Sequence, residues 1–235
     1  MEKNPIGQIV YDCSHIATEF LINAISYSKN IKYEVSGKEN IPKTKEPLII
    51  AANHSKQVDL CFFGKNLHYN SMDHMLIGTS ASASIFPPYN IVHFFNMNFK
   101  PKDVPFAEKY NELTRQIPFS NKKDDYRKAM EMAKQLLSER EMVAIFSGPA
   151  ESREKRSKIP ARLALETRAN IMPVYISISG KNGKEPESMF CKDTEKISVR
   201  YLSIIDISRF LKQNEGKNEG ELVNLLNEEV WSFMQ

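Results

Sequence analysis

Long hydrophobic runs, internal repeats and low-complexity tracts are all missing from this 235-residue sequence. A helix that spans a bilayer needs about 18 or more apolar residues in a row, so we expect no membrane-crossing segment. The N-terminus has no compact apolar run followed by a small-residue cleavage site, which argues against a secretory signal. With 41% hydrophobic and 26% charged residues, the composition fits a folded domain and excludes a disordered or solenoid chain.

Cysteine and net charge are also scarce. Cys13, Cys61 and Cys191 share no short spacing, so they predict neither a disulfide framework nor a metal site, and their odd number fits a reducing cytosol. The 32 Lys and Arg residues barely exceed the 29 Asp and Glu residues, and a net charge of +3 does not indicate nucleic-acid binding. The histidines other than His54 lack ligand-like spacing. We therefore expect a cytoplasmic protein with no nucleic-acid partner and no bound metal.

Strand-like apolar runs alternate with helical patterns over most of the chain. This alternation predicts an α/β domain with a mixed, largely parallel central sheet flanked by helices. We expect strands at residues 31–37, 48–52, 74–78, 90–95, 142–146, 171–178 and 197–205. We expect a helix to begin in residues 58–67, and further helices at 103–116, 124–139, 161–168 and 222–233.

The first part of the chain has a different pattern. Residues 6–27 repeat apolar side chains at steps of three and four, which is typical of a long amphipathic helix. We therefore divide the chain into an N-terminal helix (1–30) and a domain (31–235). Two positions are possible for the apolar face of this helix: it packs on the domain's own sheet, or it lies in a lipid interface.

A histidine and an aspartate follow the buried run at 48–52. His54 comes directly after Asn53, and Asp59 follows five residues later. In one interpretation, His54 is a polar loop residue and Asp59 caps a helix. In the other, Asp59 reaches back from the first helical turns and fixes the imidazole tautomer, so that the other ring nitrogen can take a proton from a hydroxyl. Since no G-x-S-x-G nucleophile motif is present, such a base would activate a substrate hydroxyl directly.

The stretch YEVSGKENIPKTKEPLIIAANHSKQVDL (33–60) resembles the opening of the glycerolipid acyltransferase family, the 1-acylglycerol-3-phosphate acyltransferases. In that family a V-x-G-x-E-N-[IL]-P phrase precedes a strand and then Asn-His-x4-Asp. LALETRANIMPVYI (163–176) is similar to the family's closing block, and the resemblance runs from about residue 31 to about residue 178. It implies that His54 is the catalytic base and Asp59 its orienting acid. It also implies an acyl thioester of coenzyme A or acyl carrier protein as co-substrate, with no bound cofactor.

The two middle blocks depart from the family pattern. The second block normally ends in Arg, where this chain has Lys122. The third is normally Phe-Pro-Glu-Gly-Thr-Arg, and FSGPAESR (146–153) fits it only with a shift. The same loop also resembles the Gly-Gly-x-x-Glu-like loop of the diacylglycerol acyltransferase branch, whose acceptors lack a phosphate. Two interpretations are open for Arg153, Arg156 and Lys158: a phosphate clamp or a solvated basic loop. We expect substrate binding from Asn53, Ser55, Lys122, Gly148, Glu151, Arg153 and Arg156.

Three functions are consistent with these residues. The first is transfer of a fatty acyl group from acyl-CoA or acyl carrier protein to the hydroxyl of a lysophospholipid or related glycerolipid. The second is a weakened or non-catalytic relative that binds lipid or acyl groups, and the third is an acyl-thioester hydrolase. For the first, the resemblance implies a protein that lies peripherally on the cytoplasmic face of a membrane.

Overall fold

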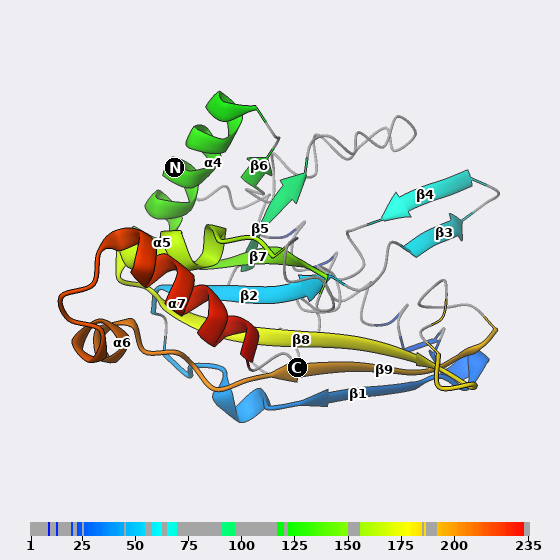
Figure 1. Ribbon diagram of the computed structural model, residues 1–235. Coiled ribbons are helices and arrows are strands. Elements are labelled where there is room, and N and C mark those ends of the chain that lie inside the picture. Colours follow the sequence, from blue (N-terminus) through cyan, green and yellow to red (C-terminus); the bar gives the residue numbers. More distant parts are fainter. Residues whose placement is uncertain are drawn as a thin grey trace.

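The computed structural model (Figure 1) describes residues 9, 13, 20, 23–24, 26–44, 46–54, 58–62, 65–69, 91–96, 117–119, 122–149, 156–184, 186 and 192–232. At residues 54, 58–62, 65–69, 91–96, 118–119 and 147–149 the backbone alone is described.

A seven-stranded sheet forms the centre of the protein, with the strand order β1-β9-β8-β2-β7-β5-β6. Five of its strands run parallel to one another: β8, β2, β7, β5 and β6. β9 is antiparallel to β8, and β1 is parallel to β9. The mixed, largely parallel sheet predicted from the sequence is thus confirmed. The strands are β1 (Lys32–Ser36), β2 (Leu48–His54), β5 (Ile91–Asn96), β6 (Ile117–Phe119), β7 (Met142–Pro149), β8 (Asn170–Gly180) and β9 (Thr194–Tyr201).

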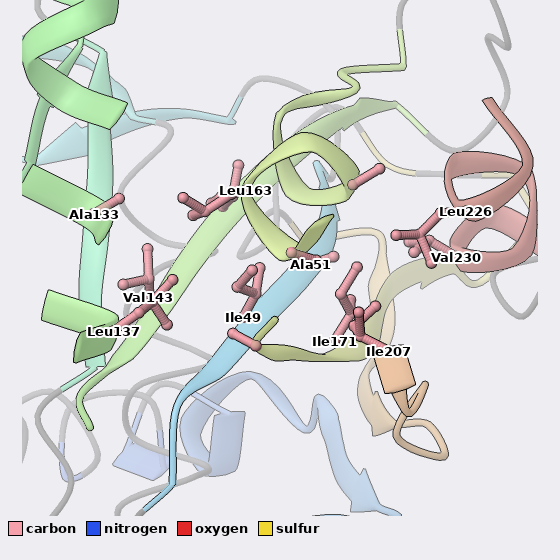
Figure 2. Close-up of a cluster of buried hydrophobic side chains, with 14 of the residues drawn as sticks. Ile49, Ala51, Ala133, Leu137, Val143, Leu163, Ile171, Ile207, Leu226 and Val230 are labelled. Atoms are coloured by element: carbon pink, nitrogen blue, oxygen red, sulfur yellow. The ribbon is translucent and has the colours of Figure 1, made fainter. Parts of the chain in front are cut away.

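The central strands are apolar on both faces because both faces are covered. Residues 48–52 of β2 are fully buried, and residues 142–145 of β7 are almost so. Successive side chains of a strand point to opposite faces. Figure 2 shows the cluster on one face, where Ile49, Ala51, Val143 and Ile171 of the sheet meet side chains from the helices. The alternate residues of the same strands contribute to a second cluster on the other face, including Leu48, Ile50, Ala52, Met142, Ala144, Met172 and Val174.

The helices α4 (Lys123–Ser138), α5 (Ile159–Thr167) and α7 (Glu219–Ser232) cover the face of the sheet shown in Figure 2, and Ile207 and Phe210 of α6 (Ile207–Gln213) join the same cluster. α4, α5 and α7 are close to their predicted positions. α7 begins with a reciprocal cap: the Asn218 carboxamide accepts from the Glu221 backbone N–H, and the Glu221 carboxylate accepts from the Asn218 N–H. This arrangement satisfies donors that every helix start leaves unpaired, and it fixes where α7 begins.

The sequence prediction was wrong at residues 58–67. Instead of a helix, the chain forms a separate two-stranded antiparallel sheet of β3 (Val58–Phe62) and β4 (Lys65–Tyr69). Val58, Leu60 and Phe62 alternate with Asp59 and Cys61. This period-two pattern fits a strand, and an apolar run this short does not distinguish strand from helix by itself.

Three further elements differ from expectation. Strand β9 ends at Tyr201 rather than at 205, and Ile205 makes a single bridge to Ile171. A short helix, α6 (Ile207–Gln213), then follows, capped by the Asp206 carboxylate, which accepts from the Arg209 N–H. Strand β6 was not predicted. The predicted strand at 74–78 and helix at 103–116 lie outside the described residues.

The predicted N-terminal helix lies largely outside the described residues. Its described positions, which include 26–29, are helical, and Phe20 and Tyr27 are 76% and 92% exposed. In the part of the chain that the structure describes, no helix is long and apolar enough to span a bilayer.

Candidate active site

The ends of the parallel strands bring several predicted site residues to one edge of the sheet. His54 is the last residue of β2, and its register partner is Pro149, the last residue of β7. Figure 1 shows the arrowheads of these two strands side by side. β5 and β6 end at the same edge because they are parallel to β7. Lys122 follows β6 immediately before α4 and is exposed. In parallel sheets this carboxyl edge is where ligands bind.

The pairing of β2 with β7 shifts just before His54. Ala52 lies opposite Phe146, but His54 lies opposite Pro149, so Asn53 alone faces the two residues Ser147 and Gly148. Two residues opposing one is the definition of a β-bulge, a feature that is over-represented next to active sites. Gly148, predicted as a substrate-binding residue, is therefore placed in this bulge, at the level of Asn53.

Asn53 is held tightly inside the sheet. Its Nδ2 donates to the carbonyl oxygen of Ile176 at 2.8 Å, and its Oδ1 accepts from the Ile176 backbone N–H at 2.7 Å. The residue is 3% exposed. Because both functions of its amide are bonded to β8, the Asn53 side chain is part of the sheet architecture.

Asp59, the predicted partner of His54, lies in β3 opposite His68 of β4. Its predicted position in a helical turn is therefore wrong, and its approach to the imidazole remains a prediction. The other predicted binding residues of the strand-end loops, Ser55, Glu151 and Arg153, lie outside the described residues.

Arg156 contacts the C-terminal helix. Its guanidinium carbon lies 4.6 Å from the centroid of the Trp231 ring in α7, within the range of a cation–π interaction. Two residues later, the Lys158 ammonium donates to the Asn224 carboxamide oxygen of the same helix at 2.7 Å. The segment that leads from β7 into α5 is thus fastened to α7 at two points. No local sequence pattern predicts this contact, because Trp231 lies 75 residues beyond Arg156.

The glycine of the opening phrase has a structural role. Gly37 follows β1 with a φ of 74°, and a Cβ at this position would lie 1.9 Å from the carbonyl oxygen of Tyr201. Asn40, at the end of the short 3-10 helix η1 (Lys38–Asn40), donates from its Nδ2 to that same oxygen at 2.9 Å. Gly37 and Asn40 of this motif therefore hold the start of the domain against Tyr201, the last residue of β9.

The largest pKa shift among the described residues belongs to Glu34, which lies away from the carboxyl edge of the sheet. Side-chain hydrogen bonds from Lys196 and Lys32 lower the pKa of Glu34 to about 2 from its usual 4.5. Glu34 is on β1, which β9 and β8 separate from β2. This exposed ion cluster joins β1 to β9 and is not part of the candidate site. Among the described residues, no group of three or more His, Cys, Asp and Glu could hold a metal ion.

The family model described as Acyltransferase matches residues 32–177, which is more than half of the chain. The protein therefore belongs to the acyltransferase family, and the family resemblance read from its motifs is confirmed. Among solved structures, the 1-acyl-sn-glycerophosphate (LPA) acyltransferase PlsC from Thermotoga maritima is similar to it. The TM-score is 0.51 and the identity 18%, over 92% of this chain and 79% of that chain. At this identity the likeness shows a common fold. No curated protein matches the sequence significantly.

Proposed function

We propose that the protein transfers a fatty acyl group from an acyl thioester, acyl-CoA or acyl carrier protein, to the hydroxyl of a lysophospholipid or related glycerolipid. One observation carries the proposal. In a chain of the acyltransferase family, the histidine of the Asn-His-x4-Asp motif ends a central parallel strand, beside the end of the strand that leads into the third motif block. The name of the similar fold, an LPA acyltransferase, supports a glycerolipid acceptor.

The proposed reaction uses His54 as a general base. The imidazole takes the proton of the acceptor hydroxyl, and the oxygen attacks the thioester carbonyl carbon. A C–O bond forms, the C–S bond breaks, and the thiolate leaves and receives the proton from the imidazolium. Asp59 holds the imidazole in the productive tautomer, a role for which a carboxylate is suited because it accepts from one ring N–H.

Acceptor binding is assigned to two basic residues that follow strand ends in the sequence. Lys122 is exposed, immediately before α4 and three residues after the end of β6, and Arg153 comes four residues after the end of β7 in the sequence. Arginine offers a two-pronged set of donors to a phosphate, and lysine offers a point charge. Arg156 is assigned a different task, because its guanidinium already stacks on Trp231. We propose that it anchors the loop rather than the phosphate.

The substrates also suggest where the protein works. Lysolipids reside in membranes, and Phe20 and Tyr27 are exposed apolar or aromatic side chains in the N-terminal helical segment. We propose that this segment lies in the interface of the cytoplasmic leaflet, with the active site facing the bilayer surface. Apolar burial is the main source of such attachment.

A thiol-release assay with the purified protein tests the proposed function. Acyl-CoA is supplied alone or with a panel of lysolipids: lysophosphatidate, lysophosphatidylcholine and monoacylglycerol. Release that requires one of the lysolipids, together with the acylated product by mass spectrometry, is the expected result. Release that is independent of any acceptor would instead indicate a thioester hydrolase. No release with any acceptor, from acyl-CoA or from acyl carrier protein, would contradict the proposal.

A further inference from the structure

We propose that Asn53 is a positioning residue: its side chain takes the place of a backbone pairing and so fixes the backbone that carries His54. The inference rests on the proposed function, in which His54 is the base. It gives Asn53 a task other than binding substrate.

The first observation is where the pairing of β2 with β8 stops. The parallel ladder runs from Leu48 opposite Asn170 to Ala52 opposite Val174 and goes no further. Beyond it, the Asn53 carboxamide bonds to both the N–H and the C=O of Ile176, at 2.7 and 2.8 Å. A carboxamide has the same donor and acceptor as a peptide group. The side chain therefore continues the hydrogen bonding to β8 after the backbone of β2 has left it.

The second observation is the bulge on the opposite side of the same residue. The register with β7 shifts between Ala52 and His54, so that two residues of β7 face Asn53. At this one position β2 is thus released from its normal register with both neighbouring strands. A strand end that is released in this way needs another restraint if the next residue is to be held in place. The buried amide of Asn53 supplies that restraint one residue before His54.

Few side chains can provide this pair of hydrogen bonds. Aspartate keeps the acceptor for the Ile176 N–H, but it has no donor when ionised and sets an oxygen against the Ile176 carbonyl. Leucine has nearly the same shape and removes both bonds, leaving two backbone groups of Ile176 without this partner. Displacement of a catalytic group by about 1 Å can cost on the order of a hundredfold in rate. The loss is therefore expected in kcat, while substrate affinity is kept.

The test compares Asn53→Leu and Asn53→Asp with Asn170→Leu as a matched control. Asn170 is at the other end of β8, where its Oδ1 accepts from the Ile207 backbone N–H at 3.1 Å. The control removes one side chain–backbone bond at the opposite end of β8 from the edge where β2 ends at His54. We expect kcat for acyl transfer to fall about ten- to a hundredfold in both Asn53 variants. The KM for acyl-CoA and for the acceptor should stay within about twofold. Asn170→Leu should have a lower Tm but an unchanged kcat per folded molecule. The folded fraction of each variant is measured by circular dichroism and thermal unfolding.

A second arm asks whether Asn53 acts through His54. In the His54→Ala background, Asn53→Leu should leave the small residual rate unchanged, because the group that it positions is absent. An equal further loss in that background would overturn the inference. The inference would also be overturned if the Asn53 variants raised KM and left kcat unchanged, or if they lowered Tm as Asn170→Leu does without lowering kcat. Failure of both Asn53 variants to fold, while Asn170→Leu folds, would overturn it as well. If His54→Ala itself keeps full activity, the assignment of His54 as the base in the proposed function has failed, rather than the geometry of Asn53.

Discussion

A methyl group at residue 37 tests how closely the start of the domain approaches β9. In Gly37→Ala the new Cβ would lie 1.9 Å from the Tyr201 carbonyl oxygen, and the residue would have to keep a φ of 74°. An L-residue in this left-handed region costs about 1–2 kcal/mol. Overpacking against a group that is fixed in the sheet adds about 1–3 kcal/mol. The expected loss of about 2–5 kcal/mol corresponds to about 4–20 °C in Tm for a chain of this size.

Gly183→Ala is the matched control. Gly183 has a φ of 68°, and among the described residues no heavy atom lies within 4 Å of the position of its added Cβ. It carries the same left-handed cost, about 2–8 °C, without the contact. Both substitutions also restrict the unfolded chain equally, so that effect cancels in the comparison.

The measurement is thermal unfolding followed by circular dichroism, together with KM for the acceptor at a temperature where both variants are folded. We expect Gly37→Ala to melt several degrees below Gly183→Ala, with the KM of both variants near the wild-type value. Equal Tm values would show that residue 37 does not press against β9. A raised acceptor KM in Gly37→Ala alone would show that the phrase contacts substrate.

The remaining predictions concern charge, anchoring and the membrane. Arg153→Ala should raise the KM for a phosphate-bearing acceptor about ten- to a hundredfold, since a charge-assisted hydrogen bond is worth about 1.5–3 kcal/mol. Arg156→Gln should instead lower Tm and change that KM little. If Arg156→Gln raises the KM and Arg153→Ala lowers only Tm, the two roles are exchanged. Because the folded-state pKa of Glu34 is lowered to about 2, the stabilisation that it gives is present above pH 4.5 and lost as the pH falls towards 2. The Tm difference between wild type and Glu34→Gln should therefore shrink over that range, and a difference that is constant with pH would refute the ion cluster. The double substitution Phe20→Asp and Leu21→Asp should release the protein from anionic liposomes in a flotation assay without lowering Tm. A strongly lowered Tm would instead show that the N-terminal helix packs in the core.

The sequence was sufficient to predict most of the sheet because its central strands are buried on both faces. Such strands appear as continuous apolar runs, as at 48–52 and 142–146, and α4 shows a clear apolar face with Ala133 and Leu137 turned to the core. The β3–β4 hairpin was missed because its short apolar run fits both periods. α6 was missed because a seven-residue helix holds less than two full turns of pattern.

Part of the candidate site was also readable. The Asn-His-x4-Asp spacing and the strand before it placed His54 at a strand end, where the structure puts it. The task that we infer for Asn53 depends on Ile176, 123 residues away, and on a register shift that no local pattern encodes. The anchoring of Arg156 depends in the same way on a distant tryptophan. Contacts of this kind arise only when the strands and helices are assembled.

The role of His54 in acyl transfer is tested by measuring the acylated product that wild type and His54→Ala form from acyl-CoA and a lysolipid, side by side in one vesicle preparation. Acceptor-dependent product and free thiol in equal amounts are expected for the wild type. Because a general base typically contributes about 10²–10⁴-fold to the rate, His54→Ala should lower kcat by about that factor, with an unchanged circular dichroism spectrum. A folded His54→Ala protein that forms product at the wild-type rate would show that His54 is not the base.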